Sequence, residues 1–272
     1  MKLLFLVVLL PSVIYAEEVP LWEAGLGLAL VNTPAYRGVD ARRTFVFPFP
    51  YINYNGRVMK AEGNTVRGML FYSDNIELNI SAGGSTPGNS DDLETRRGMP
   101  DLDPAMEIGP TLNLMLAEQQ GHKWKLGARF PARAVLSTDF SSVEYRGWLF
   151  NPHLNLDLRD SWPGPGWKWG FAIGPLFATA RYHEYFYSVA PQYATPSRPA
   201  YTAAGGYSGM RFTTALSKRY NRLWLGGYVR YEAIDGAVFD DSPLVNSRHD
   251  FSAGFAIAWI FNQSSKKVEV QD

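Results

Sequence analysis

The residues whose chemistry could support hydrolysis lie in polar stretches between apolar segments. An Asp-Asp pair at 240–241 and a His-Asp pair at 249–250 fall in or beside one such stretch, and an Asp-Asp pair at 91–92 falls in another. A protease that activates water needs a carboxylate and a histidine within hydrogen-bond reach. The nearby motifs Asp-Ser-Pro and Asp-Leu-Asp-Pro are also typical of turns, in which a carboxylate accepts hydrogen bonds from backbone amides. We interpret these aspartates as turn formers and predict no catalytic residue.

A serine nucleophile is the second chemistry that the sequence raises. Ser208 lies in the glycine-containing motif Gly206-Tyr207-Ser208-Gly209, and a nucleophilic serine would need a histidine as its general base. The spacing departs from G-x-S-x-G, and the strand, sharp turn and helix that give that motif its meaning are not predicted here. Glycines at this place are better explained by a bend or a close backbone approach where a loop enters a strand.

Metal ligands are few and scattered. The four histidines, His122, His153, His183 and His249, show neither clustering nor the i,i+4 spacing of a zinc site. Asp101 and Asp103, taken with residues 91–92, lack the regular ligand spacing of a calcium loop. We therefore predict no metal and no cofactor.

Strands must position all of these residues, because apolar side chains recur with a period of two and helical periodicity is nearly absent. Between 150 and 159, for example, Leu154 and Leu156 alternate with Asn155 and Asp157. Such runs exceed the five or six residues usual in soluble strands and match the ~10-residue tilted strands of outer-membrane barrels. Strands are predicted near residues 21–31, 44–54, 57–63, 65–73, 76–84, 106–117, 123–136, 145–159, 167–180, 206–219, 223–233 and 250–261, of which 57–63 alternates poorly.

The N-terminus predicts export. Lys2 supplies a positive n-region, residues 3–10 an apolar h-region and Ala16 a cleavage site, so residues 1–16 are interpreted as a signal peptide that is removed before Glu17. The chain has no cysteine, so a disulfide framework is excluded. Removing Lys2 leaves 25 basic residues (26 minus 1) against 26 acidic ones. This near balance gives no support to a nucleic-acid partner, which favours a basic face.

The connections between the predicted strands sort into long and short ones. Long polar stretches occur near 33–43, 84–105, 188–206 and 234–249, and short breaks near Ser73, Gln119, 162–166 and Tyr220. No apolar run after the signal peptide is long enough for a transmembrane helix, so a membrane location requires a closed barrel. Short periplasmic turns and long outer loops are typical of bacterial barrels.

We therefore predict an all-β fold, a transmembrane antiparallel up-and-down β-barrel of about twelve strands, with ten as the alternative. The barrel spans 17–261 and a polar C-terminal tail spans 262–272. The predicted location is the outer membrane of a Gram-negative bacterium, with both termini in the periplasm and outer-membrane lipid around the barrel.

Charged residues within the strands share one parity. An Arg or Lys that faces lipid near the midplane costs ~2–4 kcal/mol, so these side chains are predicted to face the lumen. They are Arg67, Glu77, Glu107, Lys125, Arg129, Arg133, Asp157, Arg159, Arg211, Arg230 and Glu232. A barrel of about twelve strands lies between sizes that are filled by side chains and sizes that leave a channel. The charges could form a polar network that fills the lumen, or they could line a narrow pore.

Four sequence blocks resemble the MipA/OmpV family of outer-membrane proteins. They are "RRGMPDLDPAMEIGP" at 96–110, "RPAYTAAGGYSGMRFTTALSKRY" at 198–220, "GAVFDDSPLV" at 236–245 and the terminal "FSAGFAIAWIF" at 251–261. The resemblance implies an outer-membrane barrel with no catalytic motif. It also implies that partners include a murein lytic transglycosylase and a murein synthase, which some members bring together as scaffolds, whereas others are described as adhesins or porin-like channels. The tail at 262–272 departs from the family, whose members usually stop at the terminal aromatic.

The resemblance makes a non-enzymatic scaffold for peptidoglycan-remodelling enzymes the leading hypothesis. A periplasmic partner could contact Trp162 and Trp167 in the break between two strands, together with the tail. The alternatives are a narrow channel for a small solute and a surface adhesin that acts through the outer loops. Trp259 and Phe261 in the last strand resemble the signal read by the barrel-assembly machinery, which would be a partner during insertion.

Overall fold

The computed structural model of the chain describes residues 18–55, 59–62, 65–73, 75–85, 89–119, 123–160 and 163–269. Within these ranges the side chains of 59–69, 72, 84–85 and 269 are not described. The predicted signal peptide, residues 1–16, and Trp162 lie outside the described residues.

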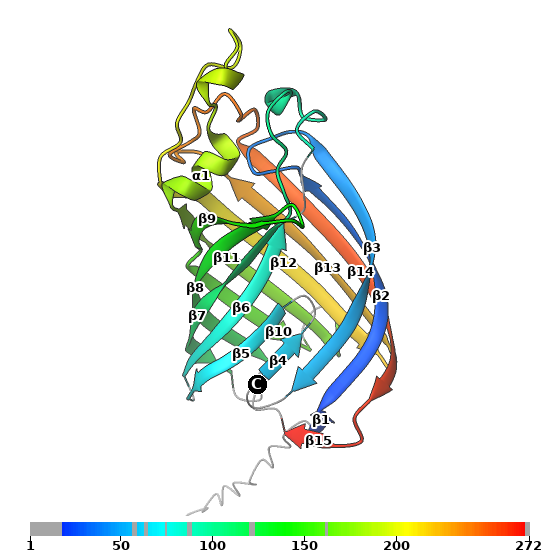
Figure 1. Ribbon diagram of the computed structural model, residues 1–272. Helices are drawn as coiled ribbons and strands as arrows, with labels where there is room; N and C mark the ends of the chain where they lie inside the picture. Colours follow the sequence, from blue (N-terminus) through cyan, green and yellow to red (C-terminus); the bar gives the residue numbers. More distant parts are fainter. Residues whose placement is uncertain are drawn as a thin grey trace, which may run out of the picture.

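The described strands form one closed antiparallel barrel (Figure 1). Each pairs with its neighbours along the chain, and the last barrel strand pairs with the first to close the cylinder. The strands of the barrel are β2 (Trp22–Pro34), β3 (Arg42–Asn55), β4 (Met59–Glu62), β5 (Thr65–Tyr72), β6 (Ile76–Ser85), β7 (Ala105–Glu118), β8 (Trp124–Thr138), β9 (Val143–Phe150), β10 (His153–Arg159), β11 (Trp167–Ala178), β12 (Gly206–Tyr220), β13 (Leu223–Ala233) and β14 (His249–Gln263).

β9 and β10 are two halves of one wall strand, because each pairs with both β8 and β11. The break falls at Asn151 and Pro152, where proline has no N–H to give to the ladder. The Asn151 side chain donates to Pro175 O at 2.9 Å and so ties the break to β11. Counting β9 and β10 together, the described residues make twelve wall strands, and the predicted antiparallel barrel is confirmed.

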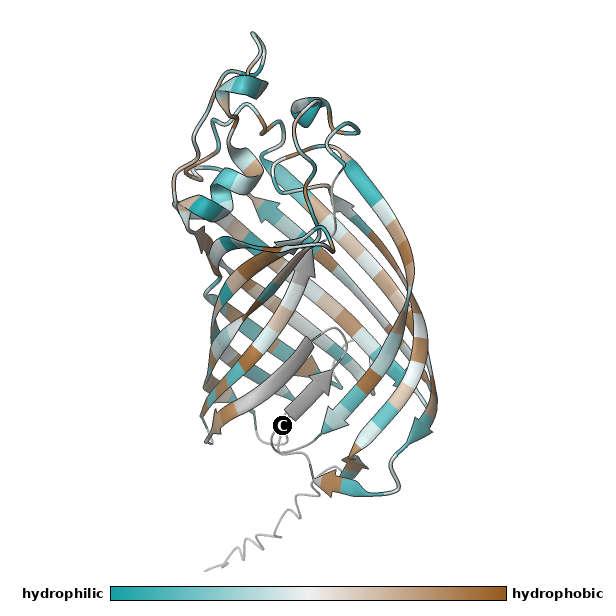
Figure 2. Ribbon diagram, viewed as in Figure 1, coloured by the Kyte–Doolittle hydropathy of each residue, from teal (hydrophilic) through white to brown (hydrophobic). Residues whose placement is uncertain are grey.

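The wall is apolar outside, and its inner face is largely small or polar except beside β3, where aromatic side chains point inward. In β14, Trp259 is 56% exposed whereas its neighbours Ala258 and Ile260 are buried. The same alternation puts Leu26 and Leu28 of β2 outside, next to the buried Glu23. Figure 2 shows hydrophobic and hydrophilic residues alternating along the strands. Side chains that point out therefore meet lipid, as the period of two predicts.

The two ends of the barrel differ (Figure 1). One, here called the loop end, carries the connections 35–41, 89–104, 179–205 and 234–248, which include η1 (Glu94–Arg96), α1 (Ala180–Tyr187) and η2 (Pro191–Tyr193). The other, the terminal end, carries short turns and a separate two-stranded sheet in which β1 (Glu18–Pro20) pairs with β15 (Lys267–Glu269). No helix in the described part of the chain has the length and apolar character needed to cross a membrane.

The wall is thinnest at the β4–β5 hairpin. Within the described ranges, β4 pairs with β3 at Tyr54 and Asn55, and β5 pairs with β6 over Glu77–Ser81. Both contacts lie in the half of the barrel near the terminal end. The weak alternation of residues 57–63 thus corresponds to a short strand within a partial hairpin, and the strand count of twelve still holds.

Candidate functional site

A hydrophobic core lies outside the barrel, in the connections at the loop end. It consists of nine buried residues, which are Tyr36, Val39, Leu93, Leu102, Tyr187, Ala203, Ile234, Ala237 and Phe239. The rings of Tyr187 and Phe239 stack with centroids 3.7 Å apart. Hydrogen bonds join the connections further, since Tyr36 Oη donates to Leu244 O at 2.6 Å and Ser242 Oγ donates to Tyr187 O at 2.7 Å. We call this packed set of connections the cap.

The cap crosses the mouth of the barrel. Leu93 and Leu102 belong to the connection between β6 and β7, whereas Phe239 belongs to the one between β13 and β14. These two strand pairs lie on opposite sides of the closed cylinder. Connections from opposite sides that share one core must meet over the opening, and Figure 1 shows them gathered at that end. The predicted outer loops are therefore a structured lid with a core of its own.

His183 and Ser208 form a buried pair beneath the cap. Ala204 O can only accept a hydrogen bond, so His183 Nδ1, 2.6 Å away, carries the proton, and Nε2 accepts from Ser208 Oγ at 2.6 Å. This is the geometry of a nucleophile and its base. Both residues are fully buried and the imidazole packs on Phe239, however, so the hydroxyl has no approach for a substrate. The pair works as a clamp between α1 and β12.

Burial controls the charge of His183. Desolvation lowers the pKa of His183 to about 4, with a smaller lowering from the cation of Arg37, while the hydrogen bond to Ala204 acts in the opposite direction. The imidazole is therefore neutral at neutral pH, as its hydrogen bonds require. Burial likewise raises the pKa of the Tyr182 hydroxyl to about 12, so this neighbour also stays uncharged.

A buried ionic network ties the cap to the barrel. Arg37, in the connection between β2 and β3, places its Nε 3.0 Å from Glu232 Oε1 and donates from Nη2 to Ser208 O at 2.5 Å. Arg211 Nη2 lies 2.7 Å from the same Glu232 oxygen. Arg230 lies near both Arg211 and Glu232. Arg37 Nη1 and Arg230 Nε are buried and have no hydrogen-bond partner among the described residues.

The other predicted lumen charges fall into local pairs along the inner wall. Arg133 Nη1 lies 3.4 Å from Glu107 Oε2, Arg129 Nη2 lies 3.6 Å from Asp157 Oδ2, Lys125 Nζ lies 3.7 Å from Glu118 Oε2, and Glu77 accepts from Asn79 at 2.5 Å and Asn113 at 3.0 Å. The Arg67 side chain lies outside the described residues, and Arg159 lies at the end of β10 near the terminal end. The predicted set is thus spread along the wall, and only Arg211, Arg230 and Glu232 converge beneath the cap.

Parity could have identified one ion pair that the sequence reading missed. Arg219 donates to the buried Glu23 across the terminal end of the barrel. Glu23 shares the face of Gly25 and Gly27 in β2, and Arg219 shares that of Arg211 in β12, so both fit the inward pattern. Arg37 carries no such signal, because it lies in a connection where no period applies.

The aspartates considered for catalysis occupy turns and strand ends. Asp240 accepts from Gly236 N at 3.2 Å, and Asp241 accepts from Tyr201 Oη at 2.5 Å. His249 Nδ1 lies 2.9 Å from Tyr231 Oη, whereas Asp250 accepts from Gly38 N at 2.7 Å. Neighbouring carboxylates and histidine thus point to different partners. Among the described residues, no three potential metal ligands come together.

The terminal end carries the residues expected to contact a partner. Trp167 opens β11 on the outward parity, with Lys218 Nζ 5.4 Å from its ring centroid. The preceding turn is held by Asp160, which accepts from Gly166 N at 2.6 Å. The β1–β15 sheet lies at the same end of the barrel, with Lys267 Nζ 3.7 Å from Glu18 Oε2. Trp259 and Phe261 lie on the outer wall nearby, 56% and 59% exposed.

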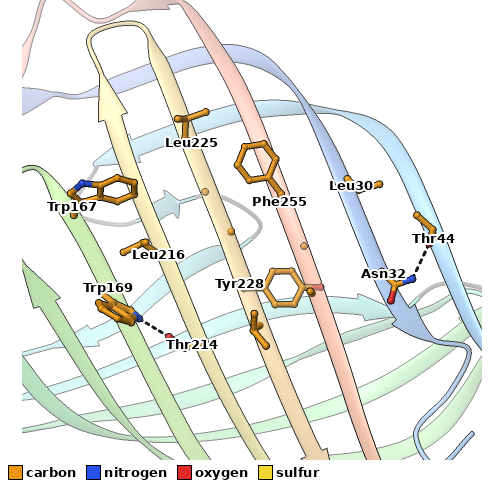
Figure 3. Close-up of a pocket in the computed structure, with 15 residues that line it drawn as sticks. Leu30, Asn32, Thr44, Trp167, Trp169, Thr214, Leu216, Leu225, Tyr228 and Phe255 are labelled. Atoms are coloured by element: carbon orange, nitrogen blue, oxygen red, sulfur yellow. Dashed lines mark hydrogen bonds between the residues drawn. The ribbon is translucent and has the colours of Figure 1, made fainter. Parts of the chain in front are cut away.

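A shallow apolar hollow of about 720 Å³ marks the outer wall (Figure 3). Its floor contains the small residues Gly227 and Ala253, and its sides include Leu30 and Phe255. The polar groups at its margins bond within the wall, since Trp169 Nε1 donates to Thr214 Oγ1 at 2.6 Å and Asn32 Nδ2 donates to Thr44 Oγ1 at 2.8 Å. The hollow therefore offers an apolar surface to lipid and no directional polar contact to a solute.

Comparisons with known proteins identify one family and several solved structures. The family described as "MltA-interacting protein MipA" matches residues 26–261. A search of curated protein sequences finds no significant match. Solved structures that match include a bacterial polysaccharide outer membrane secretin, at 9% identity over 88% of this chain and 99% of that chain with a TM-score of 0.42. Another is Pseudomonas putida OprB, at 9% identity over 88% of this chain and 94% of that chain with a TM-score of 0.38.

Proposed function

The chain belongs to the MipA family of outer-membrane β-barrel proteins, and from that membership we propose that it is a non-enzymatic scaffold that binds a murein lytic transglycosylase. The single observation that carries the proposal is the family match over 26–261, because the family is described as interacting with MltA. A murein synthase is the second partner in this proposal. The terminal end of the barrel faces the periplasm, where murein lies.

The geometry of the two ends supports a periplasmic contact surface. The cap occupies the loop end, and its apolar core side chains are buried against one another. The terminal end presents the Asp160–Gly166 turn and the β1–β15 sheet, which lie outside the wall and make no part of the barrel closure. The sheet extends the contact surface that the short turns alone would leave small.

Pull-down of a purified MltA-type lytic transglycosylase tests the proposal. One variant replaces residues 161–165 by a minimal turn, and a second ends the chain after Gln263 and so removes β15. Each variant is expected to weaken capture at least about tenfold, and the two changes together are expected to abolish it. The reason is that the free energies of binding lost at two separate contacts are roughly additive.

A matched deletion at the other end is the control. Residues 190–200 can be replaced by a short turn, because Val189 and Tyr201 already bond through their backbones, with Val189 N donating to Tyr201 O at 2.8 Å. This variant keeps the cap core and should capture the enzyme normally. Full capture by the double variant at the terminal end would refute the scaffold proposal.

A small-solute channel is the second candidate, and the inward arginines Arg129 and Arg133 of β8 favour it. It requires single-channel conductance in planar bilayers that changes in Arg129→Ala or Arg133→Ala. Conductance no greater than that of the bare bilayer would exclude it. The cap, which crosses the mouth, argues for that second result.

A further inference from the structure

Among the residues that the structure describes, the edge of β3 that faces away from β2 has no strand partner along most of its length. Among the described residues, this edge pairs only at Tyr54 and Asn55, with β4. On the other edge, which faces β2, Asn55 N donates to Leu21 O. The register pairs odd-numbered residues of β3 with odd-numbered residues of β2 and has no shift, so the odd-numbered residues of β3 direct their backbone groups to β2. Alternate residues of an antiparallel strand direct their backbone groups to opposite edges. The even-numbered residues of β3 therefore direct theirs to the open edge.

The sequence of β3 is suited to such an edge. Pro48 and Pro50 are even-numbered, so their backbone nitrogen atoms lie on the open edge. Because proline has no N–H, these two positions leave no unpaired donor there. Within sheets, proline is confined to edge positions of this kind. Because unpaired backbone groups are costly in hydrocarbon, removing two donors makes an open edge tolerable in a membrane. The interruption of the wall is therefore encoded in the chain.

The opposite side of the interruption is β6. β5 covers β6 over Glu77–Ser81, and residues 82–85 have no partner on that side among the described residues. Because β6 runs from the terminal end to the loop end, the interruption lies in the half of the wall near the loop end. Figure 1 shows the short β4–β5 hairpin set low between the long strands β3 and β6.

The inner face beside β3 is aromatic. Phe45, Phe47 and Phe49 share the parity that points into the barrel. Gly27 of β2 faces inward opposite Phe49, and a Cβ added to Gly27 would meet the Phe49 ring. Phe49 packs into a cluster with Tyr51 and Trp224. Phe47 instead remains 41% exposed on this inner face. An apolar surface is thus left uncovered at the interruption.

The inner face beside β6 is cationic. A Cβ placed on Gly83 would lie 3.2 Å from Arg133 Nη1, so the Arg133–Glu107 pair lies against the β6 side of the interruption. Beyond it, beneath the cap, Arg37, Arg211 and Arg230 share the carboxylate of Glu232. Arg37 Nη1 and Arg230 Nε are buried there without hydrogen-bond partners among the described residues. Among the described residues, the guanidinium groups of Arg37, Arg133, Arg211 and Arg230 thus outnumber the carboxylates that face them, which are those of Glu107, Glu232 and Asp250.

We propose that the interruption between β3 and β6 is a lateral portal through which the barrel takes the acyl chain of an anionic amphiphile from the membrane. The chain lies against Phe45, Phe47 and Phe49, and the carboxylate or phosphate turns toward Arg133 and the arginines beneath the cap. The cap lies across the mouth, so the portal would give the interior an access from the side. This inference does not depend on the scaffold proposal.

Thiol labelling from within the bilayer tests the portal, and the absence of cysteine gives a clean background. The full chain is reconstituted in phosphatidylethanolamine vesicles that contain a maleimide attached to the end of a phospholipid acyl chain. Phe47→Cys and, as a second inward position, Phe45→Cys are compared with Ala215→Cys, which faces inward from the fully paired β12. Val46→Cys, on the lipid-facing parity, gives the maximal rate, and heat-modifiable gel migration selects folded protein.

The portal requires Phe47→Cys and Phe45→Cys to label within about threefold of Val46→Cys and at least about tenfold faster than Ala215→Cys. The portal proposal would be overturned if Phe45→Cys and Phe47→Cys were labelled no faster than Ala215→Cys. That result would be expected if another chain covered the edge of β3. Cross-linking of photoreactive palmitate tests the charge preference. Arg133→Gln should reduce cross-linking of photoreactive palmitate more than cross-linking of photoreactive palmityl alcohol. An equal effect on both probes would overturn the assignment of the anionic group.

Discussion

Acid should open the cap through His183. In the native cap the imidazole is neutral, fully buried and clamped between Ala204 O and Ser208 Oγ. Its pKa is about 4 there, against an ordinary value of 6.5. Below pH 6.5 the opened cap therefore binds a proton that the closed cap does not, and the stability of the cap falls as the pH falls. With these values, acidification from pH 7.5 to 4.5 costs the cap about 2.5 kcal/mol, a rise of about 70-fold in the opening equilibrium.

Amide hydrogen exchange measures this opening. The amides of α1 and the Val189–Tyr201 pair report the cap, and those of β12 and β13 report the barrel, with intrinsic exchange rates corrected at each pH. Cap amides should lose about 70-fold protection at pH 4.5. Barrel amides should change far less.

Two histidine variants separate His183 from other acid-sensitive groups. His183→Asn keeps an amide that can donate to Ala204 O but has no group that titrates in this range. It should be less stable at pH 7.5 and should lose most of the acid response. His249→Asn alters a half-exposed histidine at the rim and should respond as the wild type does. An undiminished acid response in His183→Asn would show that carboxylates, not this imidazole, control the cap, and our reasoning would be wrong.

Three further substitutions test the cap, the network and assembly. Phe239→Ala removes a buried ring stacked on Tyr187 and should cost the cap about 3–5 kcal/mol, seen as faster exchange in the connections while the barrel migrates normally on gels. Glu232→Gln leaves Arg37 and Arg211 buried without their carboxylate and should cost about 3–5 kcal/mol in thermal unfolding, and an unchanged midpoint would contradict the network. Phe261→Ala should slow insertion, whereas wild-type yield and heat-modifiable migration would exclude an assembly role.

The barrel could be predicted from the sequence because each strand contacts two different media. Lipid on the outside and the barrel interior on the inside impose a period of two on each strand. This period can be recognised in single segments of the sequence, such as β14. The segment at 57–63 alternates poorly, and its described part, β4, pairs with β3 at two positions among the described residues, Ala61 and Lys60. Its weak signal in the sequence and its short pairing in the structure have the same origin.

The cap and its contacts could not be predicted in this way. Ser208 and His183 are 25 residues apart, and only the packing of α1 over β12 brings them together. Arg37 meets Glu232 across a still longer separation. Some apolar residues of the cap, such as Leu93 and Leu102, stand singly among polar and turn-forming residues, so no period marks them as part of a core. Long connections that looked like solvated loops were therefore a second folded unit.

The cap and the wall differ in what must break before the barrel interior is reached. Opening the mouth separates Arg37 from Glu232 and exposes a core that includes the stacked Tyr187 and Phe239. Breaking a buried ion pair by removing one partner costs several kcal/mol, because an uncompensated charge is left behind. Among the described residues, the even-numbered positions of β3 from Thr44 to Ile52 have no backbone pair on the edge that faces away from β2. Entry by the proposed portal therefore leaves the cap closed, whereas entry through the mouth requires the cap to open, which acid favours through His183.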